Sequence, residues 1–460
     1  MKKSRTFKVL AAAGALALAG ALTMAAQAAP STTSGTPAST ASGPPAPTYV
    51  QFSPSATKGA LYYPDPAAYP HPHVAVIAMH RDSNYLAHIS TKELPKRGFV
   101  VLGMNPRCDN NEAACAPWED DALDVKQGVN YLRKLPGIDR VVLLGHSGGG
   151  PTMTFYQAVA EQGVGFCQQP RKLVKCSDAL AGLPPVDGVI LMDAHPGNGI
   201  NALRSISADV TNDAAVLDHG AEPSTNWRLD PFDPRNGYRP DGQTHYSDAF
   251  KRRYFEAQST RMNYLIGQAQ KKLAAAQAKG QDDAPFVVPM GDNARLSQID
   301  LSVDAGTQQP EKLLKNDGTV DDREPVKSVR VQSLQPGDEK SFESTMLLTA
   351  KSFLSVRAVR STNAEDGIDF CSSNNSTPCN LQQIHVPLLV TAMGGHYFIK
   401  DAEQYYKMAA SRDKDYYVIQ GATHGGTECT ACETTDGQYA NATKNLFDLM
   451  QKWIDARFAS

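Results

Sequence analysis

The stretch from Arg140 to Pro151 constrains the fold of this chain more than any other segment. Its residues 141–144 are an unbroken run of β-branched and aliphatic side chains, which is typical of a strand buried on both faces. Residues 145–149 match the pattern G-x-S-x-G. Residues 152–162 are rich in residues that favour a helix, and Pro151 lies near the expected helix start. The stretch therefore predicts a strand, a sharp turn and a helix.

Ser147 lies at the centre of the predicted turn and is the candidate nucleophile. In a G-x-S-x-G turn the serine hydroxyl is exposed at the carboxyl edge of the sheet, and glycine is needed two residues before and after it because a Cβ would strike the strand or the helix. Glycine-rich turns also bind nucleotides. However, the chain has no G-x-x-x-x-G-K-[ST] segment and no acidic residue placed for a ribose, so the pattern favours a nucleophile.

Strands alternate with helices over the first part of the chain. We expect short edge strands at 48–52 and 60–63, buried strands at 73–79, 99–104, 141–144 and 188–192, and helices at 85–96, 118–135 and 152–162. Such alternation predicts an α/β fold, a mostly parallel sheet with helices on both faces.

The alternation stops at His195 and resumes near residue 384. The later strands are expected at 386–392 and 416–419, and the later helices at 400–411 and 439–458. Between them the chain is polar and rich in turns, with one long helix expected at 247–279 and a strand-like run at 326–331. We therefore expect a catalytic core formed by residues 48–194 and 384–460, with an inserted cap or lid domain at 195–383.

Two features of the expected cap allow more than one interpretation. Its aromatic residues could line a substrate pocket, but we expect most of them to form the cap's own small core: Trp227, Tyr238, Tyr246, Tyr254, Phe255 and Tyr264. The segment 230–241 offers carboxylates for calcium. It lacks the ordered ligand spacing and the terminal glutamate of a calcium loop, so a solvated turn is favoured.

The N-terminus has the features of a secretory signal peptide. Basic residues are followed by an alanine- and leucine-rich run that ends in Ala26-Gln27-Ala28, so residues 1–28 are the expected signal peptide and the uncharged residues 29–47 an expected disordered linker. The cleavage site disfavours a membrane anchor. A formal net charge of −3 gives no basic excess for nucleic acid. We expect a soluble protein, periplasmic or secreted.

Eight cysteines in an exported chain indicate disulfide bonds. They fall as close neighbours, which favours four local bridges: Cys108 with Cys115, Cys167 with Cys176, Cys371 with Cys379, and Cys429 with Cys432. Spacing alone does not settle the connectivity. The Cys429–Cys432 pair could instead be a redox or metal half-site, but a second half-site at matching spacing is absent from the sequence.

In this pattern the chain resembles the α/β-hydrolase superfamily of serine esterases and lipases, with a large cap that resembles no family. The resemblance rests on residues 145–149, on Val76-Ile-Ala-Met-His80 before the expected oxyanion loop, and on Gly421-Ala-Thr-His424 after the last strand. Their order matches the nucleophile, acid, histidine order of that superfamily. The resemblance implies His424 as the general base and no cofactor.

The acid is where the sequence departs most from this superfamily. The loop after the strand at 386–392 is the usual place, yet it offers no carboxylate before Asp401 and Glu403, which have another explanation as first-turn acids of a helix. Asp193 ends the strand at 188–192 and so is expected at the sheet edge where Ser147 is exposed. We therefore expect Asp193 to be the acid, with Asp401 or Glu403 as the alternative and residues such as Asp369 or Glu428 as lesser ones.

The oxyanion hole needs two backbone N–H groups aimed at the developing charge. The first is expected from Gly148, the residue after the nucleophile. The second is expected from Arg81 or Asp82, because these follow His80 where the superfamily usually has a His-Gly pair. Arg81 could alternatively bind a substrate carboxylate or form a surface ion pair.

These residues together predict an exported serine hydrolase that cleaves a carboxylic ester through an acyl-enzyme on Ser147. The same groups would serve an amidase, a peptidase or a thioesterase, because fold resemblance does not choose among them. An inert binding protein that keeps the fold without chemistry is the alternative from another class. The expected partner is a small-molecule or ester substrate.

Overall fold

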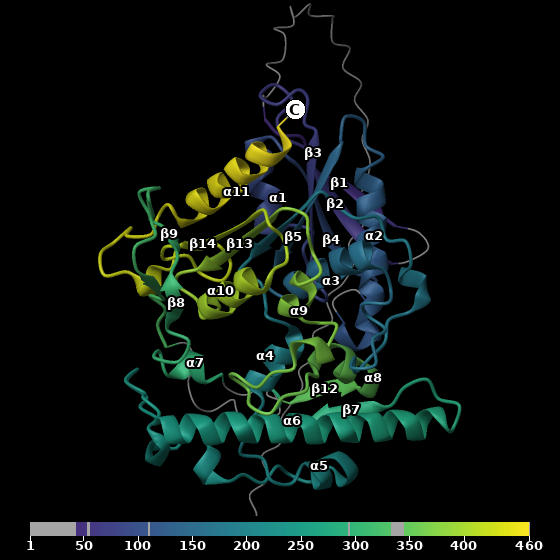
Figure 1. Cartoon of the computed structure of the whole chain (residues 1–460), viewed down its shortest axis with the longest axis vertical. Helices are drawn as coiled ribbons and strands as arrows, with labels where there is room; N and C mark the ends of the chain where they lie inside the picture. Colours follow the sequence, from purple (N-terminus) through teal and green to yellow (C-terminus); the bar gives the residue numbers. More distant parts are fainter. Residues whose placement is uncertain (1–42, 53–55, 109–110, 293–294, 333–344, 460) are drawn as a thin grey trace, which may run out of the picture. The chain divides into compact units, whose positions relative to one another are not determined.

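A ten-stranded sheet forms the centre of the computed structural model (Figure 1), which describes residues 43–52, 56–108, 111–292, 295–332 and 345–459. The expected signal peptide, and the expected linker up to residue 42, lie outside the described residues. The strands are β1 (Thr48–Gln51), β2 (Lys58–Tyr62), β3 (Val74–Met79), β4 (Val100–Asn105), β5 (Arg140–His146), β6 (Gly188–Met192), β9 (Lys312–Leu314), β10 (Val320–Asp321), β13 (Leu388–Met393) and β14 (Lys414–Ile419).

The spatial order of these strands is β1-β2-β4-β3-β5-β6-β13-β14-β9-β10. Neighbours from β4 to β9 pair in parallel, whereas β1, β2 and β10 pair in antiparallel fashion at the two ends. The expected mostly parallel sheet is therefore confirmed. β5, which precedes Ser147, lies between β3 and β6 in the middle of the sheet.

Helices cover both faces of the sheet, as expected (Figure 1). Side chains alternate along β3: Ala75, Ile77 and Met79 pack in the cluster with α2, α3 and α10, and the residues between them pack in the cluster with α11. The helices over the sheet are α1 (Ile89–Glu93), α2 (Asp121–Leu132), α3 (Gly149–Gln162), α9 (Thr377–Leu381), α10 (Ile399–Met408) and α11 (Ala442–Phe458). Because both faces are covered, the central strands are buried along nearly their whole length.

The helix expected at 85–96 is much shorter in the structure. α1 covers only Ile89–Glu93, and a single 3₁₀ turn follows at Pro95–Arg97. Tyr85 is held in a loop instead, because its backbone N–H donates to the Asn105 side chain at 2.8 Å. The His88 side chain then accepts from the Ser90 N–H and begins the helix there.

Residues 195–383 build their own apolar clusters beside the sheet. Their elements are α4 (Asn198–Ser205), α5 (Asp213–His219), α6 (Asp248–Gln277), β7 (Pro285–Val288), α7 (Leu296–Ile299), β8 (Gly306–Pro310), β11 (Pro325–Lys327), β12 (Met346–Thr349) and α8 (Ala350–Ser352). Figure 1 shows β7 and β12 lying between α6 and the elements nearer the sheet. As expected, Tyr238, Tyr246 and Tyr254 are buried in one of these clusters.

Two details correct the expected organisation of this block. Residues 312–321, which we placed in the cap, supply β9 and β10 to the main sheet, where β9 pairs with β14 and covers backbone groups that would otherwise form an open edge. In the strand-like run at 326–331, the strand continues only as far as Lys327. The chain then leaves β8, and the Val329 N–H donates to the Gly394 carbonyl at 2.8 Å.

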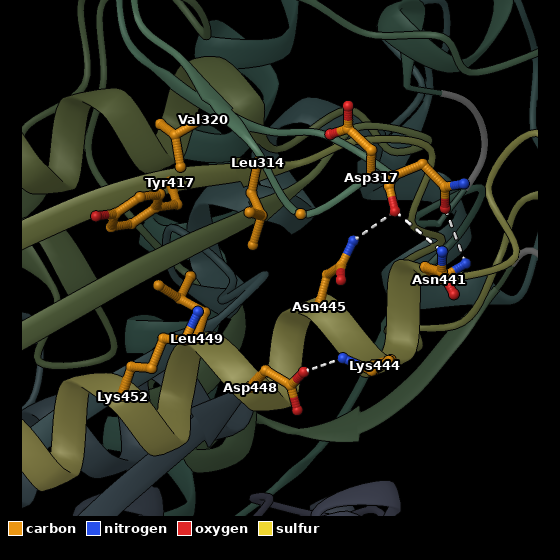
Figure 2. A pocket seen from close by; sticks show the side chains of 12 residues that line it. Leu314, Asp317, Val320, Tyr417, Asn441, Lys444, Asn445, Asp448, Leu449 and Lys452 are labelled. Carbon is orange, nitrogen blue, oxygen red and sulfur yellow. Dashed lines mark hydrogen bonds and ion pairs between the residues drawn. The ribbon is translucent and has the colours of Figure 1, made fainter.

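A hollow lies between the β9–β10 hairpin and α11 (Figure 2). Its polar groups largely satisfy one another, since the Asn445 amide donates to the Lys315 and Asn316 carbonyls at 2.9 and 3.0 Å, and Lys444 pairs with Asp448. These bonds fasten the hairpin to the helix. We therefore regard the hollow as a structural junction.

The four local disulfide bonds expected from the spacing are present in the structure, and they account for all eight cysteines. Disulfides form and persist in oxidising compartments. Over the ranges that the structure describes, we find no helix with the length and apolar character needed to span a bilayer.

Candidate active site

The turn that carries Ser147 is a tight connection between β5 and α3. Ser147 has a φ of 55°, a left-handed conformation that strains a residue with a side chain. A Cβ on Gly145 would lie 2.9 Å from the Gly150 Cα, and one on Gly149 would lie 2.6 Å from the Met79 carbonyl oxygen. The two glycines of the motif are therefore required by the close approach of strand and helix, and the serine is held where its hydroxyl projects from the sheet.

Ser147, His424 and Asp193 are joined by hydrogen-bond contacts, with His424 in the middle. The Ser147 Oγ is 3.0 Å from His424 Nε2, and His424 Nδ1 is 2.6 Å from Asp193 Oδ2. A carboxylate only accepts, so His424 carries its proton on Nδ1 and presents a lone pair on Nε2 to the serine hydroxyl. The structure thus brings together the three residues for which the sequence predicted the roles of nucleophile, base and acid.

Asp193 is fixed at the end of β6 in a left-handed conformation, with a φ of 41°. Its side chain is fully buried, and its Oδ1 accepts the Met393 N–H at 3.1 Å. Burial raises the pKa of this carboxyl, but the imidazoles of His396 and His424 outweigh burial and hold the pKa well below its ordinary value. Asp193 is therefore a carboxylate at neutral pH.

The alternative acids, Asp401 and Glu403, belong to other networks. Asp401 lies on α10 and pairs with Arg204 at 2.7 Å and with Arg295 at 3.1 Å. Glu403 accepts two backbone N–H groups from residues 308 and 309 and pairs with Lys407. Both carboxylates are therefore bound to partners other than His424.

His396 is a second imidazole beside Asp193, and no role was predicted for it from the sequence. Its Nδ1 lies 2.7 Å from Asp193 Oδ2, although the angle is outside hydrogen-bond geometry. Burial lowers the pKa of His396, and the charge of Asp193 only partly opposes that effect. The ligand atoms of Asp193, His396 and His424 lie within 4.8 Å of one another, a spacing that a metal ion could bridge.

Two further histidines, His146 and His88, support the loop that carries His424. His146 Nε2 lies 2.8 Å from the His424 carbonyl oxygen, and His88 Nε2 lies 2.9 Å from His146 Nδ1. A carbonyl only accepts, so His146 donates from Nε2 and accepts at Nδ1, and His88 donates from Nε2. Burial lowers the pKa of His146 well below its ordinary value and that of His88 to about 4, so both rings are neutral at neutral pH.

His195 also contacts Ser147, although no role was predicted for it from the sequence. Its Nε2 lies 2.9 Å from the Ser147 Oγ, and its Nδ1 lies 3.0 Å from Asn198 Oδ1. Burial and the neighbouring His424 lower the pKa of His195 well below its ordinary value. His195 and His396 shared a signal that the sequence did offer, because each follows within three residues of a parallel strand that ends at the Ser147 edge of the sheet.

The expected oxyanion residues lie around the same turn. Gly148 directly precedes α3, and a Cβ on it would lie 2.5 Å from His80 Nε2, so only glycine fits there. The Asp82 N–H lies 3.2 Å from His80 Nδ1 and is directed at that ring. The Asp82 carboxylate pairs with the buried guanidinium of Arg81 at 2.7 Å, so this ion pair is inside the protein and not on its surface.

Comparisons with known proteins find only distant similarity to solved structures. No protein-family model matches this sequence, and no curated protein matches it. Among solved structures, Est1E from Butyrivibrio proteoclasticus is 11% identical, with 90% of this chain and 100% of that chain covered and a TM-score of 0.38. A soluble variant of monoglyceride lipase from Saccharomyces cerevisiae is 10% identical, with 93% and 100% covered and a TM-score of 0.40.

Acylaminoacyl peptidase from Pyrococcus horikoshii is 12% identical and has a TM-score of 0.37, with 90% of this chain but only 41% of that chain covered. Superpositions at such scores are loose, so the fold is established by the topology of the chain's own sheet. In its mostly parallel sheet, its two helical layers and the strand, turn and helix around Ser147, this chain has the α/β-hydrolase fold.

Proposed function

We propose that this protein is an exported serine hydrolase that cleaves carboxylic esters through an acyl-enzyme on Ser147. The observation that supports this most is the continuous path from the Ser147 Oγ through His424 to Asp193, at 3.0 and 2.6 Å. Binding alone does not require a serine in a strained conformation whose hydroxyl donates to the lone pair of an imidazole. The four disulfide bonds support the export.

In the first half of the reaction, the Ser147 Oγ attacks the acyl carbon while His424 Nε2 takes the hydroxyl proton. Asp193 stabilises the imidazolium that forms, because its buried carboxylate is already in contact with Nδ1. The tetrahedral intermediate then collapses: the ester C–O bond breaks and His424 gives the proton to the departing alkoxide oxygen. The products are an acyl-serine and an alcohol.

In the second half, a water molecule attacks the acyl carbon as His424 Nε2 takes one of its protons. The bond from the acyl carbon to the Ser147 Oγ breaks, and the proton on His424 returns to Oγ. A carboxylic acid leaves and the enzyme is restored. The backbone N–H of Gly148, beside the positive end of α3, stabilises the negative oxygen in both halves. With the Asp82 N–H directed at His80, we assign the second donor to the Arg81 N–H.

The first test is labelling of the full chain by a fluorophosphonate that bears a fluorophore. We expect stoichiometric labelling of the wild-type protein, none of Ser147→Ala, and full labelling of the control Ser224→Ala, which removes an exposed hydroxyl. A panel of p-nitrophenyl esters with acyl chains of different length, and the matching anilides and thioesters, then measures the preferred bond. Labelling elsewhere than at Ser147, or hydrolysis of anilides faster than esters, contradicts the proposal.

A further inference from the structure

The Ser147 hydroxyl lies between two imidazoles. His424 Nε2 is 3.0 Å from the Oγ and His195 Nε2 is 2.9 Å from it. A nucleophilic serine needs only one base, and His424 already has the carboxylate partner that such a base requires. The second imidazole therefore needs its own explanation.

The number of available hydrogens determines which group donates in the contact between Ser147 Oγ and His195 Nε2. Ser147 has one hydroxyl hydrogen, and the lone pair of His424 Nε2 accepts it, because His424 Nδ1 uses its own hydrogen on Asp193. The Oγ then presents only lone pairs to His195. A separation of 2.9 Å is favourable there only if His195 Nε2 carries a hydrogen.

The partner of His195 on its other side is compatible with that arrangement. A neutral imidazole with its hydrogen on Nε2 needs a donor at Nδ1, whereas the Asn198 atom that faces Nδ1 at 3.0 Å is Oδ1, an acceptor. Oxygen and nitrogen of a side-chain amide are distinguished by their hydrogen bonds, and the Asn198 nitrogen as placed is buried with no partner among the described residues. Turning the amide over gives that nitrogen its partner, His195 Nδ1.

The segment that carries both residues is held firmly in place. The Asn198 N–H donates to the Asn375 side chain at 2.7 Å, and the Thr377 hydroxyl donates to the His195 carbonyl at 2.6 Å. A Cβ on Gly197, which has a φ of 150°, would lie 2.3 Å from the Asn375 carbonyl oxygen. These contacts fix the loop between β6 and α4 at the site, so the imidazole of His195 is pre-positioned at Ser147.

We propose that His195 is a second catalytic residue, which donates a hydrogen bond from Nε2 to the Ser147 Oγ, and that Asn198 is the positioning residue that sets its tautomer. The inference rests on the function proposed above. His195 keeps its proton throughout, so no bond to it forms or breaks. As His424 removes the serine proton, negative charge grows on Oγ, and the fixed donor stabilises that charge more in the transition state than in the resting enzyme.

Asn198→Asp is the sharpest test because the change is nearly isosteric. A carboxylate only accepts, so it draws the hydrogen of His195 to Nδ1 and turns a lone pair toward Ser147. We expect kcat to fall about 10²- to 10³-fold, the effect of losing one donor to a developing oxyanion. In His195→Phe, which has no donor, kcat should fall by a similar factor. His195→Gln, whose amide can still donate, should stay within about tenfold of wild type.

The pH profile separates this role from a merely structural one. The new carboxylate raises the pKa of His195, and protonated His195 donates from Nε2 again. The ratio of Asn198→Asp to wild-type kcat should therefore rise as the pH falls from 8 to 6. The control is His245→Phe, which removes an imidazole whose side chain is 72% exposed. Thermal melting checks that each variant is folded.

Each outcome has a distinct meaning. A wild-type protein that neither binds the fluorophosphonate nor cleaves any ester overturns the proposed function itself. A reactive wild type with Asn198→Asp or His195→Phe within threefold of its kcat overturns only the role of His195. Equal losses in His195→Gln and His195→Phe, or a pH-independent ratio for Asn198→Asp, also overturn the donor role.

Discussion

The carbonyl oxygen of His424 accepts a hydrogen bond from Nε2 of His146 at 2.8 Å, so the residue before the nucleophile holds the loop of the base. The same His146 ring accepts from His88 at 2.9 Å. The end of β5 and the loop after β14 are thereby joined, which fixes the distance between Ser147 and His424 independently of the bond between those two side chains. We infer that the variable position of the G-x-S-x-G turn has a supporting role in this protein.

Replacement of His146 tests that role. In His146→Ala the His424 carbonyl loses its donor, so we expect kcat to fall about tenfold and stability by about 1 to 3 kcal/mol. His146→Gln should recover most of both, since its amide can donate at a similar place. Ester hydrolysis and urea denaturation measure the two effects, with the exposed His219→Gln as control. Equal activity in the alanine variant and the wild type would contradict a supporting role.

Removal of either central residue should abolish catalysis. Ser147→Ala eliminates the attacking atom, and His424→Ala eliminates the group that takes its proton, so each should lower kcat by about three orders of magnitude or more. The double variant should be no worse than either single one, because the two act as a unit. Activity above a tenth of wild type in either single variant would disprove the assignment.

Asp193→Asn should lower kcat by about two to four orders of magnitude, because an amide at that place no longer holds the right tautomer of His424 or stabilises its imidazolium. Asp401→Asn is the comparison. It breaks the buried pairs with Arg204 and Arg295, so it should reduce stability while kcat of the folded protein changes little. The opposite result, with turnover lost in Asp401→Asn and kept in Asp193→Asn, would place the acid on α10.

Stability should decrease on acidification because of the buried histidines. His88 has a pKa lowered to about 4 by burial, whereas an unfolded histidine titrates near 6.5. Between these values the unfolded chain binds a proton that the folded chain does not, so stability falls as the pH falls from about 6.5 to about 4. His88→Gln should flatten this slope in urea titrations at several pH values. An unchanged slope would mean that His88 titrates normally in the fold.

Peptide mapping without reduction should find the four local bridges. Each closes a short loop, so each should contribute on the order of 2 to 3 kcal/mol at most through the entropy of the unfolded chain. Thiol labelling under denaturing conditions provides the second measurement. Free thiols in the exported protein, or bridges between distant pairs, would contradict the pairing.

The sequence was most informative where a residue's place follows from local geometry. Glycines at 145 and 149 predict the turn because a Cβ has no room there, and Asp193 was predicted to lie near Ser147 because adjacent parallel strands end at one edge. Both predictions depend only on the pattern of strands and turns. The α/β fold follows from that same alternation.

The features that the sequence did not predict depend on contacts between distant segments. β9 has only three residues and no periodicity of its own, and it is a strand because β14 offers it a partner. The residues before α1 have helical periodicity but are bound to Asn105. His195 follows a parallel strand, but its contact with Ser147 also depends on the loop after β6, which is held against Asn375.

The hydrogen bond from Thr377 to the His195 carbonyl joins residues 182 positions apart, so the long excursion of the chain departs from and returns to nearly the same point. The entropy of closing a loop grows only with the logarithm of its length, by about 0.6 kcal/mol for each doubling. Insertions in the exposed loops of this segment therefore cost little chain entropy, provided that Asn198, β9 and β10 keep their contacts. Selectivity for substrates would be free to diverge while the geometry around the nucleophile stays unchanged.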